Sequence, residues 1–128
     1  QAAFLNLKLP NLDEDNEKRR SVAKRYLKGI TNTKIKLPFY SGTNDHVFHL
    51  FVVLVEDRDH FMDYLTANSI ETMIHYPIPL HQQAALKSYG FLNFPLTEKI
   101  HNQIVSIPMS PVLEIDDVLK IIKVINAF

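Results

Sequence analysis

Two imidazoles and one phenol fall within one short run, His-Tyr-Pro-Ile-Pro-Leu-His at residues 75–81. Pro77 and Pro79 exclude a helix here and favour an extended backbone. The run follows an apolar stretch at residues 70–74, which we expect to be a strand. Loops that follow strands often carry the polar groups of a binding site. The run is therefore the first place in the sequence to look for chemistry.

The candidate binding side chains in this run are His75, Tyr76 and His81. Imidazole and phenol groups both donate and accept hydrogen bonds, which suits a ligand rich in hydroxyl or phosphate oxygens. The competing interpretation is that Tyr76 packs against other side chains and that the prolines only shape a chain crossover. The residues by themselves leave both interpretations open.

Other kinds of chemistry lack the residues they need. His46 and His49 are three apart on an expected strand, so their side chains should point to opposite faces. His75 and His81 would lie about 20 Å apart on an extended chain. We therefore expect no metal site. Because there is no cysteine, no Gly-x-Ser-x-Gly elbow and no glycine-rich loop, we assign no catalytic residue to this chain.

The composition is that of a single globular domain. The 128 residues include 14 basic and 14 acidic side chains, and this balance argues against a nucleic-acid binder or a protein of anionic membranes. No apolar stretch reaches the length of about 18 residues that a membrane span requires. The absence of cysteine suits the cytoplasm, where we expect this protein to reside.

The hydrophobic periodicity predicts an α+β fold, in which helices pack on a small antiparallel or mixed sheet. The strand at residues 46–55 is apolar on both faces, so we expect it at the centre of the sheet and covered on both sides. The other expected strands are residues 35–39, 70–74 and 104–108, and the expected helices are residues 1–9, 12–30, 58–67, 82–88, 96–103 and 115–128.

Local signals indicate how several helices begin and end. Asp57 is suited to cap the helix that begins at residue 58, and Asn68 to end it. Gly29 is suited to cap the C-terminus of the helix before it. The last helix should bury one apolar stripe, formed by Val118, Leu119, Ile122 and Ile125.

The sequence opens without methionine, in the middle of an apolar helical pattern at residues 1–5. We therefore expect the chain to be a piece of a longer protein. Apolar surface that the missing part covers would then be exposed. For this reason we expect the chain to self-associate or to bind its missing half.

Several ordered motifs resemble the DegT-type nucleotide-sugar aminotransferases. The resemblance covers nearly the whole chain, and the His-Tyr-Pro-x-Pro-x-His run is its most specific signal. In place of the threonine-type cap that often precedes the last helix of the family, this chain has Leu-Glu-Ile at residues 113–115. The matching segments are Gln-Ala-Ala-Phe-Leu at 1–5, Lys-Leu at 8–9, Val-Phe-His-Leu-Phe-Val-Val at 47–53, Glu-Asp-Arg-Asp at 56–59, residues 70–81, Phe-Pro at 94–95 and Ser-Ile-Pro-Met-Ser-Pro at 106–111.

The resemblance implies an enzyme of the aspartate-aminotransferase fold (fold type I), usually dimeric, that depends on pyridoxal phosphate. Such enzymes move an amino group, commonly from glutamate, onto a keto sugar linked to a nucleoside diphosphate. Residues 1–128 resemble the C-terminal small domain alone, with residues 1–30 as a helical connection from a missing large domain. That large domain binds the cofactor and carries the Schiff-base lysine, so this piece should neither bind pyridoxal phosphate nor catalyse the reaction by itself.

In the resembling family the His-Tyr pair lies near the active-site cleft. The resemblance therefore assigns contact with the sugar nucleotide to His75 and Tyr76, and less directly to His81, whereas His49 matches a structural position. The run around His75 is similar to enzymes that act on deoxythymidine-diphosphate keto-deoxy sugars, at C3 more than at C4. The alternative for the whole chain is a stand-alone α+β module that binds a small regulatory ligand or dimerises.

Overall fold

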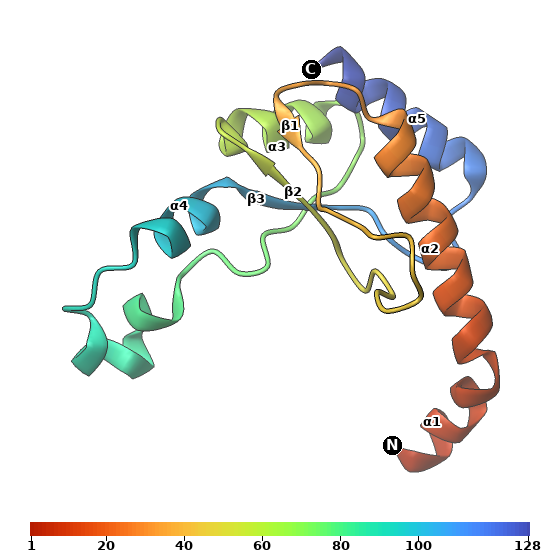
Figure 1. Ribbon diagram of the computed structural model, residues 1–128, viewed down its shortest axis with the longest axis horizontal. Helices are drawn as coiled ribbons and strands as arrows, with labels where there is room; N and C mark the ends of the chain where they lie inside the picture. The colour runs from red at the N-terminus through yellow and green to blue at the C-terminus, as the bar shows by residue number, and fades with distance from the viewer.

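A computed structural model describes all 128 residues, which form five α-helices around a three-stranded antiparallel sheet (Figure 1). The strands are β1 (Ile35–Lys36), β2 (Phe51–Val55) and β3 (Ile104–Ile107). The helices are α1 (Ala2–Lys8), α2 (Leu12–Gly29), α3 (Arg58–Ala67), α4 (Pro95–Gln103) and α5 (Ile115–Ala127), and 3-10 turns occupy Leu9–Asn11, Leu80–Gln82 and Ala84–Tyr89. The predicted α+β class is confirmed.

The sheet has the order β1-β2-β3, so β2 is the central strand, as predicted. Both pairings are antiparallel: Val53 lies opposite Val105, and Val55 lies opposite Ile35. The edge strand β1 is shorter than the predicted residues 35–39. It ends two residues before Pro38, which has no N–H to donate to a sheet.

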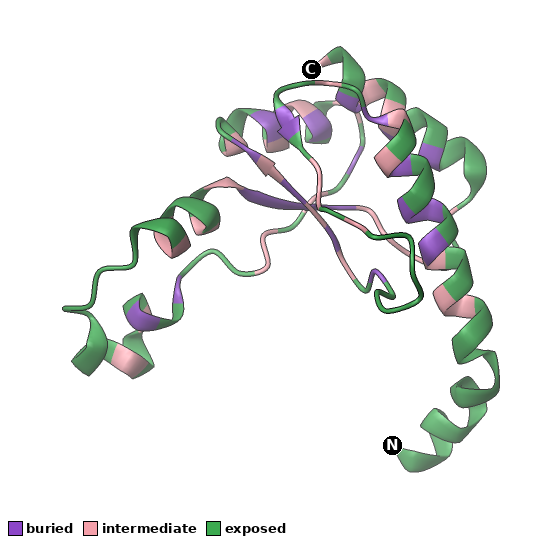
Figure 2. Cartoon of the chain, in the orientation of Figure 1, coloured by how far each residue is buried: buried purple, intermediate pink, exposed green.

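One face of the sheet carries the hydrophobic core. On β2 the side chains of Phe51, Val53 and Val55 are buried and pack with buried residues of α2, α3 and α5. Figure 2 shows the buried segments of these helices in purple. The core consists of 17 buried residues: Val22, Ala23, Tyr26, Ile30, Ile35, Phe48, Phe51, Val53, Val55, Phe61, Leu65, Ile70, Val105, Ile107, Val118, Ile121 and Ile125.

The opposite face of the sheet is covered less completely. Val52 and Leu54 of β2 alternate with the core residues and are only half-buried, with α4 as a neighbour of the strand. On β3 the alternate positions are Ile104 and Ser106, which are buried. The expectation that both faces of the central strand are covered therefore holds fully for the core face and in part for this second face.

The predicted strand at residues 46–55 is wrong over its first half. Phe48 has a positive φ of 49°, and its N–H donates to Nδ1 of His46 at 2.9 Å, so the backbone turns before β2 begins. The turn buries the Phe48 ring against the Phe51 ring, with centroids 5.9 Å apart. Because His46 and His49 lie outside the strand, the alternation argument that separated them does not apply.

The predicted strand at residues 70–74 is also wrong, because only Met73 pairs with the sheet. The N–H of Ile70 donates to the carbonyl of Leu65 at the end of α3, so it is not available to a strand partner. Met73 forms an isolated antiparallel bridge with Ser106, through hydrogen bonds of 3.2 and 2.8 Å. The two prolines that follow cannot extend this bridge into a ladder.

The helix ends follow the predicted signals with one exception, Gly29, and the buried stripe of the last helix also differs from its prediction. Asp57 caps α3 by accepting from the N–H of His60, and Asn68 ends that helix. Gly29 ends α2 without a left-handed cap; instead a Cβ here would lie 2.8 Å from Ile122 of α5, so glycine permits the close approach of the two helices. In α5 Leu119, which was predicted to be buried, is 51% exposed. Ile121 is buried in the core instead.

The helix α1 lies away from the body of the molecule (Figure 1). Its apolar side chains find no core: Phe4 is 74% exposed, Leu7 is 75% exposed, and no residue of the helix is buried. An apolar helix face of this kind is normally covered by another surface. None of the helices is both long enough and apolar enough to cross a membrane.

We expect the 128-residue chain to self-associate through α1. Sedimentation at high protein concentration should show species heavier than the 14.8 kDa monomer. Replacing Phe4 and Leu7 together by serine should shift the population toward the monomer, because the two side chains are one helical turn apart and form one patch. Val112→Ser is the matched control, since Val112 is 80% exposed but lies outside α1. A native chain that stays monomeric would contradict this prediction.

Tyr26 connects the main helix to the end of the sheet. Its side chain is fully buried, its ring packs edge-on against Phe51 at 5.1 Å, and its hydroxyl donates to the carbonyl of Pro108 at 2.9 Å. Burial, and secondly the charge of Asp117, raise the pKa of Tyr26 above its ordinary value of 10.0. The phenol therefore stays protonated in the fold.

Tyr26→Phe should lower the free energy of unfolding by about 1 kcal/mol, because it leaves the carbonyl of Pro108 unpaired. Above about pH 10 the unfolded chain loses a phenolic proton that the folded chain keeps, so native stability falls as pH rises, and the variant should lack this part of the fall. Urea denaturation at neutral and alkaline pH measures both effects. Tyr64→Phe is the control: its hydroxyl donates to Val124 at 3.2 Å from a half-buried position, so the loss should be smaller.

Candidate functional site

His75 and Tyr76 lie side by side where the chain leaves the sheet. Their peptide bond is cis, and the two rings meet edge to face with centroids 5.7 Å apart. Tyr76 is 69% exposed, and its hydroxyl makes no hydrogen bond within the chain. The structure therefore brings together two of the three predicted site residues, and the phenol is free to meet a ligand.

The position of His75 is set by β3. Its Nδ1 lies 3.0 Å from Oγ of Ser106, a buried residue of that strand. Met73, two residues earlier, is tied to the backbone of the same serine by two hydrogen bonds. His75 is itself half-buried, so its ring has one edge on the sheet. Sequence reasoning missed Ser106, because nothing at residues 104–108 indicated which strand residue would meet the loop.

His81 occupies a different environment. It is 7% exposed, its ring packs edge-on against Phe94 at 5.0 Å, and its Nε2 lies 3.0 Å from a carboxylate oxygen of Glu98. The same oxygen accepts from the N–H of Phe94 at 3.1 Å, and these two contacts lower the pKa of Glu98. His81 thus joins the loop to α4, and neither a hydrogen bond nor a ring contact connects it to His75 or Tyr76. Its predicted contact with substrate stays a prediction.

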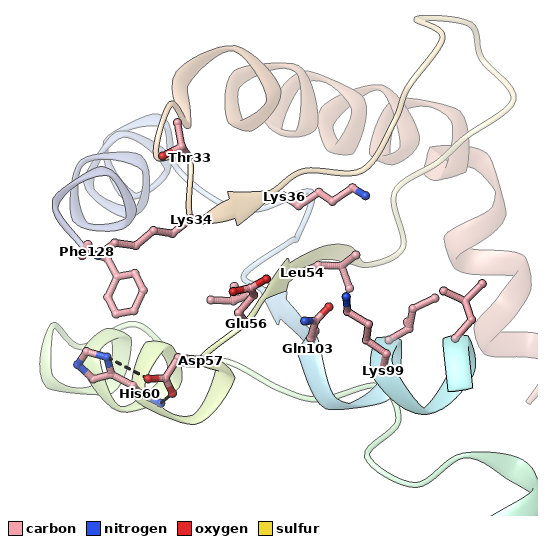
Figure 3. Close-up of a pocket in the computed structure, with 13 residues that line it drawn as sticks. Thr33, Lys34, Lys36, Leu54, Glu56, Asp57, His60, Lys99, Gln103 and Phe128 are labelled. Carbon is pink, nitrogen blue, oxygen red and sulfur yellow. Dashed lines mark hydrogen bonds and ion pairs between the residues drawn. The ribbon is translucent and has the colours of Figure 1, made fainter. Parts of the chain in front are cut away.

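A separate open groove of about 800 Å³ lies between β1, the start of α3 and α4 (Figure 3). Its lining mixes the amines of Lys36 and Lys99 with the carboxylates of Glu56 and Asp57. Lys34 crosses one end, where its amine donates to the carbonyl of Phe128 at 2.8 Å and lies 4.9 Å from the ring. None of the predicted site residues lines this groove. Its residues come from distant segments, so no sequence motif could have indicated it.

All ten lysines are exposed, and none lies in an enclosed cavity. The three glycines are far apart and form no phosphate-binding loop. The structure also has no group of three histidine or carboxylate side chains placed to hold a metal ion. The predicted contact of His75 and Tyr76 with a ligand stays a prediction; both side chains carry groups that donate and accept hydrogen bonds.

Both the sequence and the fold of this chain are similar to those of known proteins. Residues 1–126 match the DegT/DnrJ/EryC1/StrS aminotransferase family. The chain belongs to this family. Enzymes of the family depend on pyridoxal phosphate. The helices and three-stranded sheet described above are those of DegT-type aminotransferases with fold type I, so the predicted fold is confirmed.

Three relatives indicate the range of this similarity. The dTDP-3-amino-3,6-dideoxy-alpha-D-galactopyranose transaminase of Aneurinibacillus thermoaerophilus is 44% identical over 128 residues, which are 100% of this chain and 35% of that protein. DesV of S. venezuelae, in complex with a ketimine intermediate, is 34% identical with a TM-score of 0.90 over 99% of this chain and 35% of its own.

The third relative, ntda from Bacillus subtilis with bound cofactor PMP, is 30% identical, with a TM-score of 0.80 over 89% of this chain and 28% of its own. The DegT-family chain described here thus spans about a third of the length of the relatives it matches.

Proposed function

We propose that this chain is the substrate-facing part of an aminotransferase that moves an amino group onto a keto sugar linked to a nucleotide. The observation that carries the proposal is the exposed Tyr76 beside His75, anchored to the sheet in a chain of the DegT family. Both side chains can bind sugar hydroxyl or phosphate oxygens. They would bind and orient the substrate rather than make or break bonds.

The substrate class is proposed from the similarity to named relatives. One relative aminates C3 of a dTDP-linked dideoxy sugar, according to its name. A dTDP-linked keto-deoxy sugar aminated at C3, with glutamate as the amino donor, is therefore the substrate pair that we propose. The small set of contacts from His75 and Tyr76 would help to select which sugar enters.

We infer that pyridoxal phosphate and its lysine belong to the remaining two-thirds of a longer protein. In this proposal the 128 residues are the C-terminal small domain, and α1 with α2, within residues 1–30, connect it to the large domain. The exposed apolar face of α1 supports such a connection or a dimer contact. The absence of an enclosed lysine from this chain fits the same division of roles.

His75→Ala in the complete enzyme should raise the Michaelis constant for the sugar nucleotide about tenfold, with kcat little changed, because it removes a binding contact rather than a reacting group. Steady-state kinetics with the sugar nucleotide varied at saturating amino donor measures this. His49→Ala is the control, since His49 is exposed and makes no side-chain hydrogen bond. Kinetic constants that are unchanged by His75→Ala would remove His75 from the site.

The 128-residue chain mixed with pyridoxal phosphate should give no imine absorption band beyond that of free surface lysines, because none of its lysines is enclosed. A matched solution of a lysine-rich peptide sets the background of non-specific imine. A saturable band at stoichiometric cofactor would show that the chain holds its own Schiff-base lysine, contrary to the proposal.

A second candidate is a stand-alone module that binds a small ligand. The groove of about 800 Å³ favours it, because lysines and carboxylates from different segments meet there. The two candidates place the ligand at different residues. If His75→Ala weakens sugar-nucleotide binding and Lys36→Ala does not, the aminotransferase is supported. If Lys36→Ala weakens binding and His75→Ala does not, the ligand-binding module is supported.

A further inference from the structure

Ser106 holds the candidate site to the sheet through three hydrogen bonds. Its backbone N–H and carbonyl pair with Met73, and its Oγ lies 3.0 Å from Nδ1 of His75. On its other side β3 pairs with β2, where Ser106 lies opposite Val52. The serine is 6% exposed, so these contacts are shielded from water. The hydrogen bonds that attach segment 73–75 to the sheet thus all go to one residue of β3.

The direction of the side-chain hydrogen bond follows from the burial of the hydroxyl. Oγ of Ser106 has no hydrogen-bond partner other than His75 Nδ1. If the hydroxyl accepted a hydrogen from Nδ1, its own hydrogen would be buried without an acceptor, and an unpaired buried donor costs more than an unused lone pair. The hydroxyl therefore donates to Nδ1. A neutral imidazole then carries its single hydrogen on Nε2.

We propose that Ser106 is a positioning residue that fixes the tautomer of His75, so that the neutral ring, which lies against the ring of Tyr76, carries its hydrogen on Nε2 as a donor. The proposal rests on the proposed function for its effect on substrate binding, and it adds which atom meets the ligand. An N–H donor selects an acceptor oxygen, such as a phosphate or sugar oxygen of the nucleotide sugar. It does not accept a proton from the substrate, so His75 orients and does not act as a base.

Nitrogen-15 NMR of the complete enzyme, labelled at histidine, tests the tautomer directly. The His75 signals are identified by their loss in His75→Ala. At a pH where the ring is neutral, Nε2 should have the shift of a protonated ring nitrogen and Nδ1 that of an unprotonated one. The opposite assignment would overturn the inference.

Variants of Ser106 separate the hydroxyl from the strand. Ser106→Ala keeps the backbone bridge to Met73 and removes the hydroxyl, so both nitrogens of His75 should move toward the averaged shifts of exchanging tautomers. Ser106→Thr keeps a hydroxyl on a residue well suited to a strand and should restore the native shifts. Ser110→Ala is the matched control, because that hydroxyl accepts from Val112 and does not touch His75. Shifts that do not change in Ser106→Ala would also overturn the inference.

Kinetics of the same variants then test the proposed function separately. Ser106→Ala should raise the Michaelis constant for the sugar nucleotide about fivefold with kcat unchanged, the size expected for one misplaced hydrogen bond, and Ser106→Thr should stay near native. If the nitrogen shifts change as expected and the Michaelis constant does not, Ser106 still sets the tautomer and the role of His75 in substrate binding fails. If His75→Ala weakens binding and the nitrogen shifts do not depend on Ser106, the function stands and the inference fails.

Discussion

The antiparallel pairing of β2 with β3 is the constraint on which the rest of the structure depends. On one face of this pair the side chains of Phe51, Val53 and Val105 pack with buried side chains of the helices to form the core. On the other face Ser106 holds the chain that carries His75. Core and candidate site are therefore two faces of the same four-residue pairing. A change that shifts the register of β3 by one residue would turn Ser106 into the core and release the loop.

The helices could be predicted from the sequence because their apolar spacing and capping residues act locally, as Asp57 does at the start of α3. One predicted helix, residues 82–88, is wrong, because the chain forms only 3-10 turns there. The other failures concern strands, where an apolar run says nothing about available partners. Phe48 turns out of the strand because its ring completes an aromatic cluster with Phe51. Ile70 does not pair with the sheet because its N–H already donates to the carbonyl of Leu65 at the end of α3. In both places a contact with a residue nearby in the sequence, rather than the apolar run itself, set the backbone conformation.

The same distinction applies to the site. His75 and Tyr76 are neighbours in sequence, so their juxtaposition could be predicted, whereas Ser106 is 31 residues from His75 and reaches it only through the fold. His81 belongs to the same motif as His75, yet the motif did not indicate its surroundings. It is buried against α4, and its ring contacts the carboxylate of Glu98. A motif thus identifies a family more reliably than it assigns a task to each of its residues.

The contact between His81 and Glu98 has a further consequence in terms of chain entropy. It joins residues 17 apart in sequence, and so it closes the segment between the sheet and α4 into a loop. The entropic cost of such a closure depends only weakly on length, so insertions between the two residues would be tolerated far better than loss of the carboxylate. Because the pKa of Glu98 is lowered, the closure persists until the medium is more acidic than an ordinary carboxyl group would require.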